Sequence, residues 1–295
     1  MSSYAQDVKN ELAHKFDEDI DCLKAEFVAL IKVGAKKIDG RLEFTSSNAA
    51  VVRRVITLAK KFLPNVKPEV AAVRRKKLLK NLLYVVRFIF AGEVQNFFDA
   101  LDMNELLKRT RFKVAYLRGA FLAGGSVNRP EAQYFLQIVA KTEAEAKFIH
   151  KQLTNLEFNS GICQRKKIFF VWLREGDTIC DFLGMIGASE AVERFEVARN
   201  LKEIRVQVNR IVNVETAALN KSINAAQRQL ADIKILLDKK APVNKKLQEA
   251  MTVRLENPSC TVRELAEKIS MSSAGLLYRF QVIHRLAKKW LVFSG

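Results

Sequence analysis

Two runs of adjacent cations are the residues whose type and spacing most clearly predict a chemistry in this chain. RRKK occupies positions 74–77 and QRKK occupies positions 164–167. Guanidinium and ammonium groups bind phosphate oxygens, and consecutive ones can follow the backbone of a nucleic acid. The whole chain favours such a partner, because its 50 Lys and Arg exceed its 32 Asp and Glu and give a formal charge of +18. We therefore expect a polyanionic partner, with nucleic acid first and an anionic membrane surface second.

Cysteine and histidine predict neither a metal site nor a disulfide framework. They are scattered without the paired spacing of a zinc site: Cys22, Cys163, Cys180, Cys260, His14, His150 and His284. Free, mostly buried thiols in a reducing compartment are expected. The first 15 residues are too polar for a secretory signal, and no apolar run reaches the roughly 18 residues of a spanning helix. We expect a cytoplasmic protein with no cofactor and no membrane partner.

The segment YLRGAFLAGG at 116–125 has a weaker copy in the same chain, CLKAEFVALI at 22–31. The two align without a gap at an offset of 94 residues. The same offset gives three matches further along: Leu42 with Leu136, Phe44 with Ile138, and Val55 with Ile149. RRKK and QRKK correspond after a small shift in register. We interpret residues 20–200 as two copies of one unit.

Each copy shows the same order of expected elements. An apolar helix leads to a short strand, a helix of Ala, Val and Lys, a basic turn, and a second strand. The expected strands are 41–45 and 82–90 in the first copy, and 134–139 and 168–173 in the second. Small residues on the leading helices, such as Gly119 and Ala123, allow two backbones to approach closely and favour a pseudo-twofold interface. An ordinary tight helix contact is the alternative.

The leading helix of the second copy resembles the LAGLIDADG signature of homing endonucleases. The resemblance is carried by Leu117, Gly119, Phe121, Ala123 and Gly125. In those enzymes two such helices pack together and present acidic residues to metal ions at their ends. Nucleases of this architecture also bind duplex DNA on a saddle formed by their sheets.

Neither copy has an acid at the position that binds metal in that signature. The acid positions fall on Leu30 and Gly124, and the sixth positions, Val28 and Leu122, are apolar as well. Glu26 lies nearby but belongs to a different position of the motif. Since metal-assisted hydrolysis needs these carboxylates, we expect a protein that is not an enzyme.

The saddle is the first candidate surface for DNA. Under the resemblance, the basic clusters would line a phosphate track: Arg74, Arg75, Lys76, Lys77, Arg165, Lys166 and Lys167. Solvated hairpin turns are an equally open interpretation.

The stretch 188–240 is expected to run as one helix, because it contains neither glycine nor proline. Its apolar stripe is Ile204, Val208, Ile211, Leu219, Ile223, Ala226, Leu230, Ile233 and Leu237. The opposite face carries Lys202, Arg205, Arg210, Lys221 and Arg228. Either solvation or phosphate contact explains this basic face.

A helix-turn-helix is expected at the C-terminal end. From Lys239 onward there are eleven Lys and Arg against four Asp and Glu, a balance of +7. Thr261 and Glu264 have the spacing of a capping box, and Ser272 is placed to cap the second helix. The expected inner core is Leu265, Ala266, Ile269, Met271, Leu276 and Phe280. Many helical hairpins share this pattern, so a hairpin without DNA binding is the alternative.

The second helix of this motif would enter the major groove. Its groove-facing positions are Ser273, Ala274, Leu277, Tyr278 and Gln281, which lack the Arg and Asn that read base edges. The cations better suited to phosphates are Arg279, Arg285, Lys288 and Lys289. We therefore expect contacts with duplex DNA from these residues and from Ser272.

Over its full length the chain resembles the WhiA family of bacterial regulators. The most similar blocks are YLRGAFLAGGSVNRPE at 116–131, DFLGMIGASEAVERFEVAR at 181–199 and VNRIVNVETAALNKSINAA at 208–226. The resemblance implies a DNA-binding protein that takes part in cell division, the cell cycle and chromosome segregation, and in sporulation control in some bacteria. It also implies regulation of transcription and association with the nucleoid.

Together these observations predict an α+β fold. A degenerate LAGLIDADG-like domain is expected at 1–202, with repeats at about 20–100 and 114–200. A linker helix at 203–240 and an all-α helix-turn-helix domain at 241–295 follow. The alternative function is a protein-interaction hub, in which the first domain binds a partner protein and DNA binding is weak. Phe88, Phe90, Phe97 and Phe98 could serve that role, although core packing also explains them.

Overall fold

The computed structural model describes residues 3–15, 17–38, 41–74, 82–88 and 91–292. The chain forms two compact units, which we call unit 1 (1–202) and unit 2 (203–295). Within the described ranges, no helix is long and apolar enough to cross a membrane.

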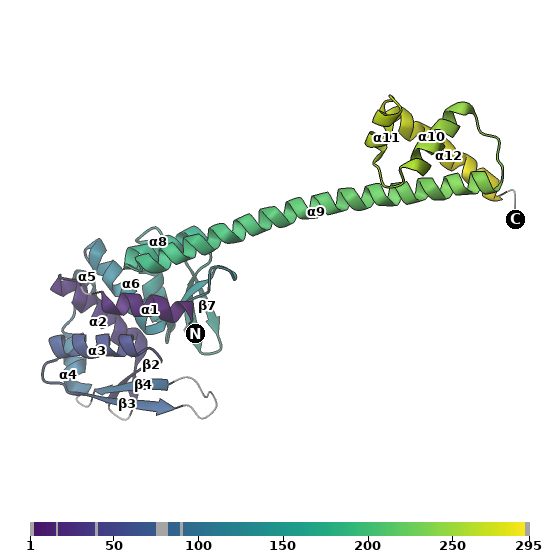
Figure 1. Cartoon of the computed structure of the whole chain (residues 1–295). Coiled ribbons are helices and arrows are strands. Elements are labelled where there is room, and N and C mark those ends of the chain that lie inside the picture. Colours follow the sequence, from purple (N-terminus) through teal and green to yellow (C-terminus); the bar gives the residue numbers. More distant parts are fainter. Residues whose placement is uncertain (1–2, 16, 39–40, 75–81, 89–90, 293–295) are drawn as a thin grey trace. The chain divides into compact units, whose positions relative to one another are not determined.

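Unit 1 is built from two copies of one α/β arrangement (Figure 1). The first copy comprises α2 (Ile20–Gly34), β1 (Ala35–Ile38), β2 (Arg41–Ser46), α3 (Ala49–Phe62), β3 (Pro68–Arg74) and β4 (Leu82–Phe88). The second comprises α6 (Thr110–Gly124), β5 (Gly125–Val127), β6 (Leu136–Ala140), α7 (Glu143–Thr154), β7 (Gly161–Arg165) and β8 (Ile168–Leu173). The strand orders β1-β2-β4-β3 and β5-β6-β8-β7 are equivalent, and every pair is antiparallel. The two copies expected from the sequence are therefore confirmed.

Each sheet has two more strands than the sequence indicated. β1 and β5 directly follow the leading helices, whereas β3 and β7 form the opposite edges. β5 is only three residues long, and β3 begins at a proline, so neither shows the alternating apolar pattern that identifies a half-buried strand. Edge strands of this kind are defined by their hydrogen-bonded neighbour rather than by their own sequence.

The structure corrects the alignment of the two leading helices. α2 and α6 each have 15 residues, and their bounds differ by 90 positions. Further along, Phe44 pairs with Ala35 and Ile138 pairs with Gly125, so the offset of 94 holds for β2 and β6. The second copy thus has four more residues between its first two strands. The equivalent of Gly124 is Gly34, whereas Leu30 is a buried residue one helical turn earlier.

The helices α2 and α6 pack against each other with symmetric close contacts. Gly119 lies against the backbone of Glu26, and a Cβ atom added to it would stand 2.9 Å from the Cβ of Ala29. At the helix ends, Gly34 lies against Ala123 and Gly124 lies against Val33. These two contacts exchange equivalent positions, as a twofold axis between the copies requires. The pseudo-twofold pairing predicted from small residues is confirmed.

A buried ion pair joins this helix pair to α3. Arg54 donates through Nε and Nη2 to the two carboxylate oxygens of Glu26, the latter at 2.7 Å, and both side chains are fully buried. Arg54 also donates to the carbonyl of Ala13, and Arg118 approaches Glu26 at 3.5 Å. Glu26, the acid nearest to the motif, is therefore held by two arginines inside the core.

The described part of unit 1 has five further helices. They are α1 (Tyr4–His14), α4 (Ala91–Asp99), α5 (Met103–Leu106), α8 (Gly176–Ile186) and the start of α9 (Ser189–Asp238). The carboxylate of Glu11 accepts from the backbone N–H groups of Glu190 and Ala191, which places an anion at the start of α9. Phe88 is buried in the core, and Phe97 and Phe98 pack against it, while Phe90 lies outside the described residues. The observed role of Phe88, Phe97 and Phe98 is core packing.

All four cysteines are free thiols. Cys22 and Cys180 are buried, and burial raises the pKa of each to about 11. Cys163 and Cys260 are half-buried.

Unit 2 is an all-α fold. The later part of α9 packs with α10 (Lys245–Glu256), α11 (Val262–Lys268) and α12 (Ser273–Val292). Of the expected stripe on α9, Ala226 and Ile233 are buried and Leu230 is half-buried. The remaining positions of this apolar stripe are exposed: Ile204, Val208, Ile211, Leu219, Ile223 and Leu237. The stripe needs a partner to be buried, and α10 to α12 cover only the C-terminal part of α9.

The local signals of the helix-turn-helix are confirmed. Thr261 and Glu264 form a reciprocal capping box at the start of α11. Ser272 accepts from the N–H of Gly275 at 3.1 Å and so caps α12. Among the expected core residues, Leu265, Ala266, Leu276 and Phe280 are buried, whereas Ile269 and Met271 are half-buried. The buried Arg254 donates to Gln229 at 2.9 Å and ties α10 to α9.

Candidate nucleic-acid interface

The outer face of the second sheet combines cations with aromatic rings. Val171 and Leu173 of β8 are buried, so the alternating Phe170 and Trp172 lie on the other face. The guanidinium of Arg174 lies 4.1 Å from the ring centre of Trp172, and that of Arg165 lies 5.9 Å from the ring centre of Phe170. These contacts orient two arginines on a surface that can accept phosphate groups.

The corresponding face of the first sheet is balanced in charge. Arg87 of β4 donates to Glu43 of β2 at 2.7 Å, and Glu69 of β3 stands beside Arg87 in the strand register. Lys36 of β1 is the register partner of Glu43. Two acids thus offset two cations in this row. The two sheets share a topology but differ in charge. Among the described residues, the saddle cations without a neighbouring acid lie mainly on the second sheet.

The structure brings together three of the predicted saddle residues. Arg165, Lys166 and Lys167 are exposed at the turn between β7 and β8, where Lys166 adopts a left-handed backbone with φ of 56°. Arg74 is the last residue of β3, and its side chain is not among those described. Arg75, Lys76 and Lys77 lie outside the described residues. Sequence reasoning missed Arg174, although the two-residue steps from Phe170 to Trp172 and from Trp172 to Arg174 place all three on one face.

The ends of α2 and α6 do not fit a metal ion. Both acid positions of the signature are glycines, Gly34 and Gly124, which offer no ligand atom. A Cβ atom added to Gly34 would overlap the ring of Phe44, and one added to Gly124 would stand 2.9 Å from the carbonyl oxygen of Val139. Across the described residues, no group of three or more His, Cys, Asp or Glu side chains is placed to hold a metal. The sixth position of the first copy is Lys32, a cation, rather than Val28.

Lysines surround these helix ends instead. Lys9, Lys36, Lys141 and Lys167 line a cavity of about 580 Å³ together with Gly34 and Gly124. Burial lowers the pKa of Lys9 to about 8 and also lowers the pKa of Lys141. Of these four lysines, the sequence had indicated only Lys167, because the other three are far apart along the chain.

The recognition helix α12 exposes the groove-facing residues predicted from the sequence. Leu277 and Tyr278 are 46% and 61% exposed, and Ser272, Ser273, Ala274 and Gln281 are exposed as well. Arg279 forms an ion pair with Glu249 at 2.7 Å and donates to the carbonyl of Lys246, so its side chain is held against α10. The phosphate contact expected from Arg279 stays a prediction.

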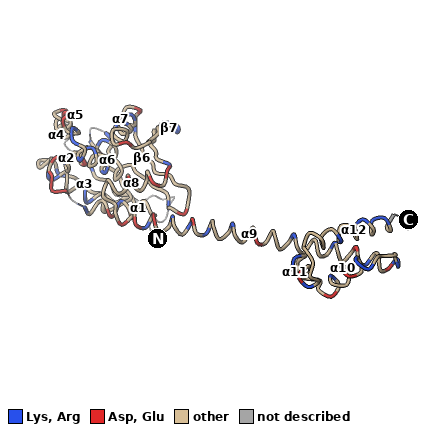
Figure 2. Tube along the Cα trace, turned by 90° about the horizontal axis from the view of Figure 1, so that it is seen from above, with Lys and Arg blue, Asp and Glu red and all other residues tan. Residues whose placement is uncertain are grey.

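The remaining cations of α12 lie beyond its first turns. Arg285, Lys288 and Lys289 are exposed, and Figure 2 shows Lys and Arg along α9 and toward the C-terminal end of α12. On α9, Arg205, Arg210, Lys221 and Arg228 are exposed, as expected for either interpretation of its basic face. Lys202 is half-buried and donates to the carbonyl of Ala132 at 3.0 Å, so it has a structural contact.

Three family models match the chain in order. The WhiA N-terminal LAGLIDADG-like domain matches residues 21–103, the WhiA LAGLIDADG-like domain matches 113–205, and the WhiA C-terminal HTH domain matches 208–287. The crystal structure of full-length DUF199/WhiA from Thermotoga maritima is similar in fold, with a TM-score of 0.61 and 21% identity over 98% of this chain and 99% of that chain. The N-terminal LAGLIDADG domain of DUF199/WhiA gives a TM-score of 0.54 at 20% identity and covers 63% of this chain and 91% of that chain.

Curated relatives match over nearly the whole chain. A probable cell division protein WhiA from Desulforamulus reducens is 36% identical over 311 residues, covering 97% of this chain and 96% of the relative. The protein of the same name from Halalkalibacterium halodurans is 35% identical over 310 residues, with coverage of 97% and 96%. With three matching domain models and relatives of this identity and coverage, the chain belongs to the WhiA family.

Proposed function

We propose that this chain is a DNA-binding regulator of bacterial cell division and chromosome segregation that controls transcription and associates with the nucleoid without cutting DNA. The observation that carries the proposal is the capped recognition helix α12, which exposes one face and carries the exposed cations Arg285, Lys288 and Lys289 in its later turns. The names of the relatives support the cellular role, because they are called probable cell division proteins. We keep the division into a domain at 1–202, a linker at 203–240 and a domain at 241–295 as part of this proposal.

The chemistry of the recognition helix favours backbone contacts over base reading. Leu277 and Tyr278 can contact thymine methyl groups and sugars, whereas neither supplies the paired donors that identify guanine. Ser273 and Gln281 are the polar groups that can reach base edges. A cation contact to a phosphate fixes the position of the protein on the duplex but carries no sequence information. We therefore propose that affinity comes mainly from phosphates, with modest sequence preference from α12.

The saddle would supply a second set of phosphate contacts. Arg165 and Arg174 are oriented by aromatic rings, and Lys166 and Lys167 extend the same edge. Because the first sheet pairs its cations with acids, we propose that DNA contacts the second sheet more strongly.

Cleavage is not part of the proposal. Hydrolysis by this architecture needs a carboxylate at the end of each motif helix, and Gly34 and Gly124 supply none. A supercoiled plasmid incubated with the protein and Mg²⁺ or Mn²⁺ is expected to stay intact. Nicking that increased with protein concentration, and that Gly34 or Gly124 variants altered, would contradict this.

The decisive experiment measures DNA affinity against salt concentration for three triple variants of the full chain. One reverses Arg285, Lys288 and Lys289 to Glu, and the second reverses Arg165, Lys166 and Lys167. The control reverses Arg53, Lys60 and Lys61, which are exposed on α3. Each lost phosphate contact should lower the salt slope by about 0.9, so a loss of up to about 2.7 is expected for either test variant.

The outcomes separate the two surfaces. If the α12 variant binds DNA with the affinity and slope of the control, the helix-turn-helix proposal is wrong. If only the variant at 165–167 matches the control, the saddle contribution is wrong and the terminal unit carries the binding.

A further inference from the structure

The ends of α2 and α6 meet at a cavity whose ionisable lining is made of lysines. Lys9 comes from α1, Lys36 from β1, Lys141 follows β6, and Lys167 belongs to the turn between β7 and β8. Among the described residues that line this cavity, none is acidic. We call it the lysine cavity. In the described part of the chain, no carboxylate lies within ion-pair distance of Lys9, Lys36 or Lys167. Glu43 is the register partner of Lys36 across β1 and β2, but it forms its ion pair with Arg87.

In a metal-dependent nuclease the ends of these two helices would form a negatively charged site. Here the glycines and lysines make the same region positively charged. The C-terminal end of a helix carries about half a negative charge, so two helix ends contribute about −1. Carboxylates at positions 34 and 124 would add to this and create a cation site, but both residues are glycine. Four lysines contribute up to +4 and outweigh the helix ends, so the lysine cavity attracts anions.

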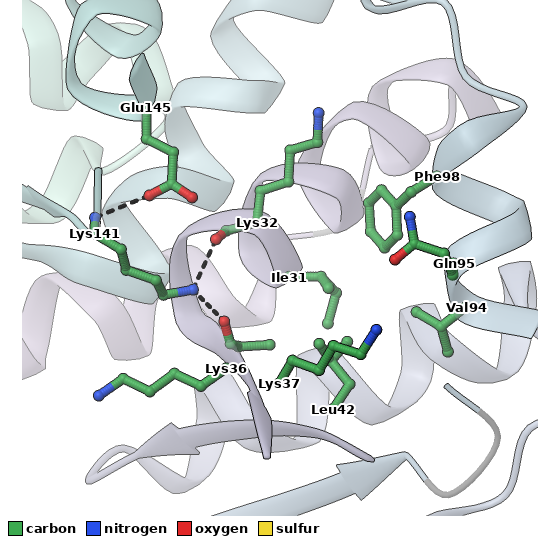
Figure 3. Close-up of a pocket in the computed structure, with 11 residues that line it drawn as sticks. Ile31, Lys32, Lys36, Lys37, Leu42, Val94, Gln95, Phe98, Lys141 and Glu145 are labelled. Atoms are coloured by element: carbon green, nitrogen blue, oxygen red, sulfur yellow. Dashed lines mark hydrogen bonds between the residues drawn. The ribbon is translucent and has the colours of Figure 1, made fainter. Parts of the chain in front are cut away.

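Lys141 uses its charge to offset one of these helix ends. Figure 3 shows its ammonium group at the C-terminal end of α2, where it donates to the carbonyl of Lys32 at 2.8 Å and to the carbonyl of Ala35. Its backbone N–H donates to Glu145, which lines the neighbouring cavity rather than the lysine cavity. Subtracting Lys141, both helix ends and the charge of Glu43 beside Lys36 still leaves an excess of positive charge from Lys9, Lys36 and Lys167.

The cations of the lysine cavity are held there at a cost in free energy. Burial lowers the pKa of Lys9, and burial with the nearby charge of Lys36 lowers that of Lys141, while Glu145 opposes the shift. Both effects disfavour the charged form of the ammonium groups. A bound anion would offset the repulsion between Lys36 and Lys141 and would stabilise their charged forms.

We propose that the lysine cavity binds a phosphoryl group, presented either by the backbone of duplex DNA or by a phosphorylated small molecule. A phosphoryl group offers several strong acceptor oxygens and up to two charges, which suits several ammonium donors. The volume of about 580 Å³ lies in the range of small-molecule sites and exceeds what inorganic phosphate needs. The rest of the lining is mainly apolar and can contact a sugar or a ring: Val33, Ala123, Val139, Ala140 and Ile168. The site does not depend on the proposed role of α12.

Calorimetric titration of the full chain with pyrophosphate at low ionic strength tests the site. We expect one saturable site per chain, with affinity at least tenfold lower in Lys36→Glu and severalfold lower in Lys36→Gln. Lys151→Glu is the control, because Lys151 is exposed on α7 and does not line the lysine cavity. It makes the same charge change in the same unit and should stay within about twofold of the wild type.

A parallel titration with a short DNA duplex identifies the source of the phosphoryl group. If Lys36→Glu weakens pyrophosphate binding but leaves the salt slope for DNA unchanged, the site takes a phosphorylated small molecule. If Lys36→Glu lowers the salt slope for DNA by about 0.9, the contribution of one phosphate contact, and the wild type does not bind pyrophosphate, the site takes the DNA backbone. Both responses together mean that the two ligands share the site. The proposal is overturned if neither response occurs, or if Lys151→Glu weakens binding as much as Lys36→Glu.

Discussion

Replacing Gly119 with Ala should destabilise unit 1, because the added methyl group has no room between α2 and α6. The new Cβ atom would overlap the carbonyl oxygen of Glu26 and stand 2.9 Å from the Cβ of Ala29. A backbone oxygen cannot rotate away as a side chain can, so the helices must separate. Overpacking of this kind costs about 1–3 kcal/mol, and we take the upper end because the clash is with backbone. Alanine recovers about 1 kcal/mol through its higher helix propensity, which leaves a net loss of about 2 kcal/mol.

Scanning calorimetry of the full chain measures this loss. For a unit of about 200 residues, 1 kcal/mol corresponds to about 2–4 °C, so the unit 1 transition should fall by about 4–8 °C. Gly184→Ala is the matched control, because Gly184 is also helical and its new Cβ would meet only Val192, at 3.9 Å. That variant should be neutral or more stable by up to about 1 kcal/mol. If both variants shift the transition equally, or if Gly119→Ala does not lower it, the close approach of α2 and α6 is refuted.

Three further predictions concern other parts of the fold. Arg54→Met should lower the free energy of unfolding by about 3–5 kcal/mol in urea titrations, because Glu26 loses its main partner while fully buried; a loss below 1 kcal/mol would show that Arg118 suffices. Lys9 has a folded pKa of about 8, below its ordinary value, so the unfolded chain binds more protons above pH 8 and the cost of burying Lys9 falls as pH rises. The stability advantage of Lys9→Met over the wild type should therefore shrink by about 1 kcal/mol between pH 7 and pH 9, and a constant difference would contradict the shift. Thr261→Ala should cost unit 2 about 1 kcal/mol in the same calorimetric scans, because it removes the helix cap; an unchanged unit 2 transition would argue against the capping box.

The sequence predicted those parts of the fold that depend on local or repeated signals. The two copies follow from a repeated segment, the close helix pairing from small residues such as Gly119, and the capping box from the spacing of Thr261 and Glu264. The core of the helix-turn-helix could also be predicted from the sequence, since apolar residues such as Leu265 and Leu276 recur on one side of each helix. Each of these signals can be recognised in the sequence before the tertiary contacts are known.

The four-residue misalignment of α2 and α6 has a physical reason. A shift of four residues along a helix is about one turn, so it keeps buried positions on the same face and preserves the apparent match. CLKAEFVALI could therefore align with YLRGAFLAGG although Gly34, not Leu30, occupies the place of Gly124. Strands allow no such ambiguity once their partners are known, because pairing fixes Phe44 and Ile138 at equivalent places.

The candidate site was only partly predictable, because its residues meet through tertiary contacts. Lys9, Lys36 and Lys141 are distant in sequence and meet only where the two helices end. The ion pair of Arg279 with Glu249 likewise depends on how α10 packs against α12. A helical pattern shows which face of α12 is apolar, but it does not show which cation on the other face finds an acid.

The four extra residues before β6 show how one copy of a duplicated fold can gain a structural role that the other copy lacks the residues for. The longer connection belongs to the copy that leads on to α9, and it supplies contacts to the start of that helix. Lys202 donates to the carbonyl of Ala132 and lies 4.6 Å from the ring centre of Tyr134, which also packs against Phe195 at 5.5 Å. A perfectly symmetric pair would offer α9 two identical docking places. The insertion breaks that equivalence, and the second copy supplies contacts to Phe195 and Lys202 at the start of α9.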